Sequence, residues 1–233
     1  LNIEFRRQSL VDGNSDPDGG IEADLTVVCI DKDHFRIISS AATRERDKFH
    51  IKKYLSKDIE LKDVTDDFCV LGLFGPKSRD LMKTLSKDNF ENDQFKFGTA
   101  KFILVDGVKI WVQRLSYVGE LGYELYVKTK DAKKIYELII KTGKEFNLCN
   151  CGMHAMDIMR MESGFLHWGH DISPEENQYQ AGLSFTISSK KEVDFIGKQA
   201  LEKIKQEKVK TRFTMFILKK IEPGKTIILH YKP

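Results

Sequence analysis

Residues 108–127 restrict the fold more than any other part of the sequence. Two runs rich in apolar and β-branched residues, 108–118 and 123–127, flank a short segment that begins and ends with glycine, 119–122. This pattern predicts two strands joined by a turn. Because side chains alternate between the faces of a strand, Glu124 and Tyr126 should share one face. Part of the core is therefore expected to be a β-hairpin.

Further strands are expected on both sides of this hairpin. Residues 21–30 and 34–39 flank an Asp-Lys-Asp turn and predict a second hairpin, which would place Asp24 on a strand. A buried strand is expected at 69–75, and two more at 212–218 and 226–231. Residues 12–20 are nearly all turn formers, so the first ordered element should begin just after them.

Helices are expected between and after the strands. The segment 43–55 is charged and compatible with a helix, with Phe49 and residues 51–55 as candidate core contacts, and Pro76 suits the first turn of another. Asp131 is a candidate N-cap for a helix whose apolar positions, including Ile135 and Ile139, recur at helical spacing. Two more helices are expected at 153–162 and 197–207. Since strands and helices do not alternate as in a doubly wound fold, we expect an α+β architecture.

Composition narrows the class of protein. The 233 residues carry 38 Lys and Arg against 35 Asp and Glu, a net charge of +3. This balance argues against nucleic acid as a partner and against binding to a membrane surface, and no apolar run is long enough to span a bilayer. The four cysteines do not resemble the disulfide framework of a small secreted domain, which indicates a reducing compartment.

Glu124 lies among aromatic residues in the predicted hairpin. A carboxylate can accept two adjacent N–H groups of a flat heterocycle while neighbouring rings stack on it. The pyrimidine edge of a pterin has that donor pattern. From the pattern alone, an ordinary surface hairpin is the stronger interpretation.

A family resemblance adds to this interpretation. The run Tyr-Val-Gly-Glu-Leu-Gly-Tyr-Glu at 117–124 is similar to the Tyr-x-Gly-Glu-x-Gly-x-Glu signature of the glycine-cleavage T-protein (aminomethyltransferase) family. Other segments resemble family segments in the same order: Gly-Gly-Ile-Glu-Ala-Asp-Leu-Thr-Val at 19–27, Val-Leu-Gly-Leu-Phe-Gly-Pro at 70–76, Arg-Met-Glu-Ser-Gly at 160–164 and Asp-Phe-Ile-Gly-Lys-Gln-Ala-Leu at 194–201. The resemblance spans about residues 19–218.

The resemblance implies a fold, a cofactor and a site. The fold is a cloverleaf of lobes round a central cavity that holds tetrahydrofolate, with 19–211 as the folate-binding domain. Residues 1–18 are a poorly determined opening segment, and 212–233 begin a C-terminal β-barrel domain that we expect to be truncated. Asp24 is the implied catalytic residue, close to the folate nitrogens that receive the one-carbon unit. The implied folate-binding residues are Asp24, Leu25, Thr26, Tyr117, Glu124, Leu125, Tyr126 and Phe185.

One departure favours a branch of the family. T-proteins proper have an arginine that helps to bind folate where this chain has Met156, and the branch attached to dimethylglycine and sarcosine dehydrogenases also lacks it. The implied partner is then a flavin dehydrogenase domain, with a lipoyl carrier protein as the alternative. No Gly-x-Gly-x-x-Gly fingerprint occurs, so we expect no flavin site in this chain. A non-catalytic folate-binding or regulatory module is the second hypothesis.

Two further expectations concern metals and location. Cys149, Cys151 and His154, followed by His167 and His170, are spaced more tightly than common zinc sites, so we expect no metal. Met153, Met156 and Met159 are expected in the core or a cavity wall. We expect a cytoplasmic location if the chain is bacterial and the mitochondrial matrix if it is eukaryotic.

Overall fold

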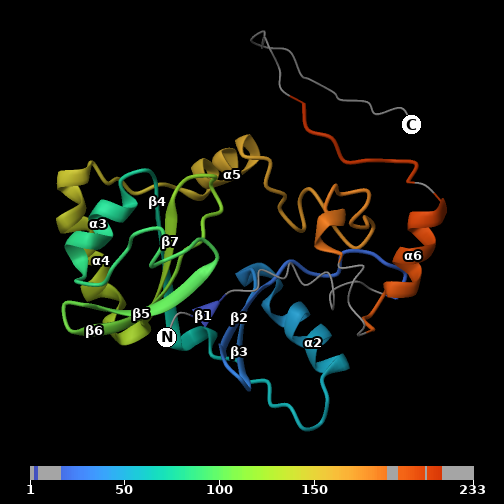
Figure 1. The fold of residues 1–233 in the computed structure, drawn as a ribbon, viewed down its shortest axis with the longest axis horizontal. Coiled ribbons are helices and arrows are strands. Elements are labelled where there is room, and N and C mark those ends of the chain that lie inside the picture. The colour runs from blue at the N-terminus through green and yellow to red at the C-terminus, as the bar shows by residue number, and fades with distance from the viewer. Residues whose placement is uncertain (1–2, 5–16, 188–193, 208, 217–233) are drawn as a thin grey trace. The chain divides into compact units, whose positions relative to one another are not determined.

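The computed structural model describes residues 3–4, 17–187, 194–207 and 209–216 (Figure 1). The chain divides into two compact units. The first consists of Leu1–Arg7 and Thr26–Phe165, and the second of Gln8–Leu25 and Leu166–Pro233. No helix within the described ranges is both long and apolar enough to cross a membrane.

The strands found within the described ranges all belong to the first unit. They are β1 (Ile3–Glu4), β2 (Thr26–Asp31), β3 (His34–Ile38), β4 (Phe68–Phe74), β5 (Thr99–Val105), β6 (Val108–Gln113) and β7 (Gly122–Lys128). Five form one sheet in the order β1-β5-β6-β7-β4, and every neighbouring pair is antiparallel. The other two, β2 and β3, form the predicted hairpin.

The helices are distributed over both units. The first unit holds α2 (Arg44–Tyr54), α3 (Ser78–Leu85), α4 (Thr129–Gly143), α5 (Met153–Glu162) and the short 3-10 helices η1 (Ala41–Thr43), η2 (Thr65–Asp67) and η3 (Lys144–Phe146). The second holds η4 (Ser184–Thr186) and α6 (Lys198–Glu207). The expected α+β class is confirmed.

The main core fills the space between one face of the five-stranded sheet and two helices. Figure 1 shows α3 and α4 on the same side of that sheet. Ile135 and Ile139 of α4 are buried there, as the helical spacing predicts, against Leu125 of β7. Phe90 packs edge-on against Tyr123, with ring centroids 5.8 Å apart. Such aromatic contacts add to the apolar area that this face buries.

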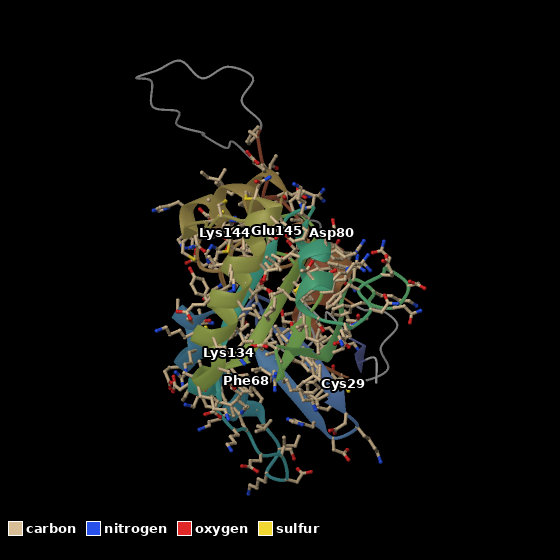
Figure 2. All side chains as sticks on the ribbon, turned by 90° about the vertical axis from the view of Figure 1, so that its left-hand side faces the viewer. Cys29, Phe68, Asp80, Lys134, Lys144 and Glu145 are labelled. Carbon is tan, nitrogen blue, oxygen red and sulfur yellow. The ribbon has the colours of Figure 1, made fainter. Side chains whose placement is uncertain are left out.

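The opposite face of the sheet is covered by the β2–β3 hairpin. Val28 of β2 is buried in a second cluster with Trp111 of β6 and Tyr126 of β7. Phe68 of β4 packs at the edge of this cluster and lies toward the same end of the unit as Cys29 of β2, whereas Asp80 and Glu145 lie toward the other end (Figure 2). The sheet is therefore covered on both faces, by helices on one and by a hairpin on the other.

The second unit has a small core of its own. Ile21, Ile172 and Ala181 are buried together, and the indole N–H of Trp168 donates to the carbonyl of Ile21 over 2.8 Å. Gly19 has φ +90°, and a Cβ there would lie 3.2 Å from Ile204 of α6. A glycine therefore suits both the backbone conformation and the close packing at this position.

Several expected elements are corrected. The first described strand is Ile3–Glu4, ahead of the turn-forming segment, and it pairs with β5. Phe49 is 72% exposed, because the buried face of α2 is instead occupied by Asp47, whose carboxylate accepts from Thr43 Oγ1 over 2.5 Å. Asp131 lies inside the first turn of α4, since the helix already begins at Thr129. Pro76 lies in the turn before α3.

The expected C-terminal strands are not found in the described part of the chain. Residues 212–216 have no regular secondary structure, and Phe213 N donates to Gln180 O over 2.8 Å. The remainder of 212–218 and all of 226–231 lie outside the described residues. The expected beginning of a β-barrel there is unconfirmed.

Candidate functional site

The segment between β6 and β7 is a loop rather than the end of a strand. The expected strand 108–118 was too long, because β6 ends at Gln113. Ser116 Oγ accepts from Val118 N over 3.3 Å, a local bond that offers the backbone an alternative to strand pairing. Gly119 follows with φ +76°. Tyr117 therefore lies on a loop, and the strand resumes only at Gly122.

Tyr117 is held by an aromatic contact. Its ring stacks on that of Phe165 with centroids 6.2 Å apart and an interplanar angle of 17°. The loop is also fixed against the end of α5, where Ser163 Oγ donates to Val118 O over 3.3 Å. A Cβ at Gly119 would lie 2.0 Å from that Ser163 oxygen. The loop and the end of α5 thus define each other's position.

Glu124 and Tyr126 form a hydrogen-bonded pair on one face of β7. The Tyr126 hydroxyl donates to Glu124 Oε2 over 2.7 Å, which confirms that the two side chains share a face. Tyr126 is buried and Glu124 is half-buried. Burial, together with the adjacent Glu124 carboxylate, raises the pKa of the Tyr126 hydroxyl well above its usual range. The hydroxyl is therefore a permanent donor that orients the carboxylate.

The cross-strand neighbours of Glu124 differ sharply on its two sides. Gln113 of β6 pairs with it on one side and Gly72 of β4 on the other. Gln113 is fully buried, and neither its Oε1 nor its Nε2 has a hydrogen-bond partner among the described residues. Gly72 presents no side chain at all. The Phe74 ring occupies the space beside Gly72, where a Cβ would lie 2.7 Å from Phe74 Cε2. The unused hydrogen-bonding capacity next to the carboxylate is therefore on the side of Gln113.

The hairpin adds a cation to this face. The guanidinium carbon of Arg36 of β3 lies 5.0 Å from the ring centroid of Phe68 and 5.5 Å from that of Trp111. Burial lowers the pKa of Arg36, although an arginine in this range stays charged. Arg36 Nη1 and Trp111 Nε1 are buried without a hydrogen-bond partner in the described part of the chain. We use "polar face" for the residues Arg36, Trp111, Gln113, Glu124 and Tyr126.

Thr26 lies on the side of the hairpin that faces the sheet. It is two residues from Val28, whose side chain packs against Tyr126 and Trp111. Period-two alternation therefore directs Thr26 toward the sheet as well. Among the implied folate-binding residues, the structure brings together Glu124, Tyr126 and this side of β2.

Leu125 faces the other way. Its side chain is fully buried in the core under α3 and α4, on the opposite face of the sheet from Glu124. The strand alternation that pairs Glu124 with Tyr126 requires this. Only the backbone of Leu125 is available on the side of the polar face.

Asp24, Leu25 and Phe185 belong to the second unit. Asp24 is exposed and Leu25 is buried. The expectation that Asp24 lies on a strand was wrong: β2 begins at Thr26, and the preceding segment pairs elsewhere, with Ile21 N donating to Glu176 O over 2.9 Å. Phe185 is in η4 and 81% exposed.

A cavity of about 330 Å³ opens at the loop between β6 and β7. It is lined by Phe97, Arg114, Leu115, Ser116 and the turn residues Gly119, Glu120, Leu121 and Gly122. Glu124 and Tyr126 do not line it. Arg114 is already bonded to Phe95 O and to Asn92 Oδ1, so the cavity is a feature of the loop and separate from the polar face.

The cysteines and histidines singled out in the sequence do not form a metal-binding cluster within the described residues. Within the described ranges, no three His, Cys, Asp or Glu side chains gather closely enough to hold an ion. All four cysteines are free thiols. Met153 is 72% exposed, so its expected place in the core was wrong, whereas Met156 and Met159 are half-buried.

Sequence reasoning missed Arg36, Trp111 and Gln113. Each lies on a different strand from Glu124, and their convergence depends on the register of β6 against β7 and on where the hairpin packs. The alternation along β6 carried a detectable signal. Trp111 and Gln113 share one face of the strand, and the apolar residues Ile110 and Val112 share the other.

The fold is similar to a known transferase. The structure of the glycine cleavage system aminomethyltransferase T from Bartonella henselae matches with a TM-score of 0.69 and 20% identity, over 85% of this chain and 55% of that chain. At that identity, the match establishes the fold. The two proteins therefore share an α+β fold.

The sequence comparisons establish the family. Residues 14–191 match the GCVT N-terminal domain, so the chain belongs to the glycine-cleavage T-protein (aminomethyltransferase) family. The mitochondrial dimethylglycine dehydrogenase of Homo sapiens is 35% identical over 205 residues, which cover 87% of this chain and 24% of that protein. The aminomethyltransferase of Alkaliphilus metalliredigens is 32% identical over 202 residues, which cover 86% of this chain and 54% of that protein. The chain thus spans about a quarter of the dehydrogenase and about half of the transferase.

Proposed function

We propose that this chain is a tetrahydrofolate-dependent one-carbon transfer domain that produces 5,10-methylenetetrahydrofolate. The observation that carries the proposal is the Glu124 carboxylate, oriented by Tyr126 and flanked by the unpartnered amide of Gln113. Unsatisfied polar groups are rare in a folded interior, so a cluster of them on one face calls for an explanation. A ligand with several N–H and C=O groups supplies one.

Glu124 would hold the pterin. An ionised carboxylate accepts two adjacent N–H donors in a bidentate arrangement, which is stronger and more directional than a single neutral hydrogen bond. The donor from Tyr126 restricts the carboxylate to one orientation before the ligand arrives.

Asp24 would act during the transfer step. In the family the matching carboxylate lies near the folate nitrogens that receive the one-carbon unit. There it can accept a proton or stabilise developing positive charge. The exposure of Asp24 is compatible with contact with a small molecule.

The donor we propose is the imine or formaldehyde equivalent produced by a flavin dehydrogenase domain. The relation to a dimethylglycine dehydrogenase and the presence of Met156 in place of the family arginine support this branch. An aminomethylated lipoyl carrier protein is the alternative donor. We propose the mitochondrial matrix for a eukaryotic source and the cytoplasm for a bacterial one.

The test separates Glu124 from Asp24. Glu124→Gln replaces an acceptor oxygen by an N–H donor, so folate affinity should fall roughly ten- to a hundredfold, equivalent to about 1.5 to 3 kcal/mol. Asp24→Asn should leave affinity within a few fold and reduce turnover by on the order of a hundredfold. Calorimetric titration with tetrahydrofolate and a methylene-transfer assay with formaldehyde measure the two effects.

The experiment includes a control variant and a result expected from the alternative hypothesis. Glu137→Gln changes an exposed carboxylate on α4 and should alter neither quantity. A non-catalytic folate-binding module would bind tetrahydrofolate and show no turnover in any variant. Equal loss of binding in Glu124→Gln and Asp24→Asn, without a separate loss of turnover, would contradict the assigned roles.

A further inference from the structure

Two exposed thiols face each other in the loop between η3 and α5. Sγ of Cys149 and Sγ of Cys151 are 3.9 Å apart, and both residues are exposed. The other two cysteines differ from this pair. Cys29 and Cys69 are half-buried in β2 and β4, and Cys29 Sγ donates to Asp31 O over 3.1 Å. Two of the four thiols are therefore an exposed pair, and the other two are half-buried on separate strands.

The loop that carries the pair is anchored on both sides of Cys149. Asn147 adopts φ +59° after η3, and Leu148 N donates to Gly143 O over 2.9 Å. Leu148 packs closely on Gly143, where a Cβ would lie 2.4 Å from Leu148 Cδ2. Between the two cysteines, Asn150 Nδ2 donates to Tyr136 Oη over 2.9 Å. These contacts limit the conformations of the Cys-Asn-Cys segment, so the sulfurs are presented together.

The geometry allows a bond between the two sulfurs. A disulfide needs an S–S distance of about 2.0 Å and Cα atoms about 4.4 to 6.8 Å apart. Two residues separated by one other have Cα atoms at most about 7 Å apart, so a non-extended Cys-Asn-Cys segment falls within the range. The two sulfurs must approach from 3.9 Å to bonding distance.

We propose that Cys149 and Cys151 are a reactive dithiol that exchanges with small-molecule disulfides of the glutathione class. The thiolate of Cys149 attacks the disulfide, forms a mixed disulfide and releases one thiolate. Cys151 then loses its proton to solvent, its thiolate attacks Cys149 Sγ, and the second thiolate leaves. In total, two protein thiols are oxidised to one disulfide, and one small-molecule disulfide is reduced to two thiols.

The electrostatics assign the order of attack. The hydrogen bond with Cys149 and the charge of its sulfur raise the pKa of the Cys151 thiol, so Cys151 keeps its proton in the first step. Once Cys149 is in the mixed disulfide, its negative charge is gone and that cause of the raised pKa disappears. Cys151 then becomes the better nucleophile. A short, exposed ring also favours a labile disulfide over a structural one.

The experiment uses the full chain and oxidised glutathione. The reduced protein is equilibrated in glutathione buffers of increasing oxidised fraction, quenched with acid and mapped by mass spectrometry. The peptide with both cysteines should lose two hydrogens, whereas Cys29 and Cys69 stay reduced and serve as internal controls. Limiting iodoacetamide on the reduced protein should label Cys149 before Cys151.

Two single variants test the intramolecular step. In Cys149→Ser and Cys151→Ser the remaining thiol has no neighbour to resolve it, so a glutathione adduct should persist that the wild type loses. Accumulation of the same adduct in the wild type would overturn the proposal. It would also be overturned if the pair reacted no faster than Cys29 and Cys69, or if non-reducing electrophoresis showed disulfide-linked dimers in place of the internal bond.

Discussion

The Tyr126 hydroxyl donates a hydrogen bond of 2.7 Å to the carboxylate of Glu124 two residues earlier on the same strand. Tyr126 packs with Val28 and Trp111 beneath the hairpin, so its ring cannot move without disturbing that cluster. The position of the carboxylate is thus tied to the packing of the sheet.

Tyr126→Phe keeps the ring and removes the donor. The carboxylate of Glu124 then samples more orientations, and folate affinity should fall about fivefold, equivalent to ~1 kcal/mol. Calorimetric titration measures the change. Tyr136→Phe is the matched control, because it removes a hydroxyl that contacts Asn150, remote in sequence from β7. Unchanged affinity in Tyr126→Phe would show that the hydroxyl does not orient the ligand contact.

Gln113→Leu replaces a buried amide that has no partner in the described part of the chain. Removing an unsatisfied polar group should raise the free energy of unfolding by about 1 kcal/mol. Folate affinity should fall in the same variant if the amide contacts the ligand. Urea unfolding measures the first effect, and Gln94→Leu at an exposed position is the control. A loss of stability would mean that the amide is already satisfied in solution.

Met156→Arg restores the residue type that T-proteins proper have at this place. The variant should bind folate more tightly, because a guanidinium supplies hydrogen-bond donors that a thioether lacks. Wild-type protein should release ammonia from an aminomethylated carrier protein only slowly. If the wild type already did so at a rate typical of T-proteins, the assignment to the dehydrogenase branch would be wrong.

Gly119→Ala should destabilise the chain more than Gly107→Ala. Both glycines have almost the same positive φ, +76° and +77°, but a Cβ meets Ser163 Oγ at 2.0 Å in the first and open space in the second. Gly107→Ala should cost about 1 kcal/mol from backbone strain, and Gly119→Ala should exceed it by at least another ~1 kcal/mol. Chemical denaturation of both variants checks this. Equal losses would indicate that Ser163 moves aside freely.

Asp63→Asn should destabilise the chain near neutral pH and have less effect in acid. The hydrogen bond from Arg44, 3.0 Å long, is the main cause that lowers the pKa of Asp63 below its usual range. A lowered folded-state pKa stabilises the protein above the unfolded pKa, about 4, and the effect is lost as the pH falls through the folded value. Thermal unfolding of both proteins at pH 7 and pH 2.5 measures the difference, which should be smaller at the lower pH.

Local sequence patterns predicted the elements whose signals are local. Both ends of the helix at 153–162 were predicted correctly, and Gly164, with φ +73°, follows it as expected at a helix end. The shared face of Glu124 and Tyr126 depends only on the alternation of side chains along one strand. The apolar positions Ile135 and Ile139 follow in the same way from helical spacing.

The features that were missed depend on long-range pairing. The backbone of Ile21 bonds to that of Glu176, far along the chain, and not to the predicted hairpin. The strand of the hairpin begins only at Thr26, so Asp24 lies outside it. The burial of Gln113 follows from its register against Glu124, and the position of Arg36 follows from how the hairpin packs. Spacing in a single segment carries no information about such contacts.

The two faces of β7 offer a route to altered ligand preference. Tyr123, Leu125 and Val127 project into the helix-covered core, whereas Glu124 and Tyr126 project from the opposite face. Every second residue of β7 therefore packs under the helices, and the residues between them do not. A library that randomises Thr26, Gln113 and Glu124 together could explore new ligands while the main core preserves the scaffold, which makes this sheet a favourable starting point for directed evolution.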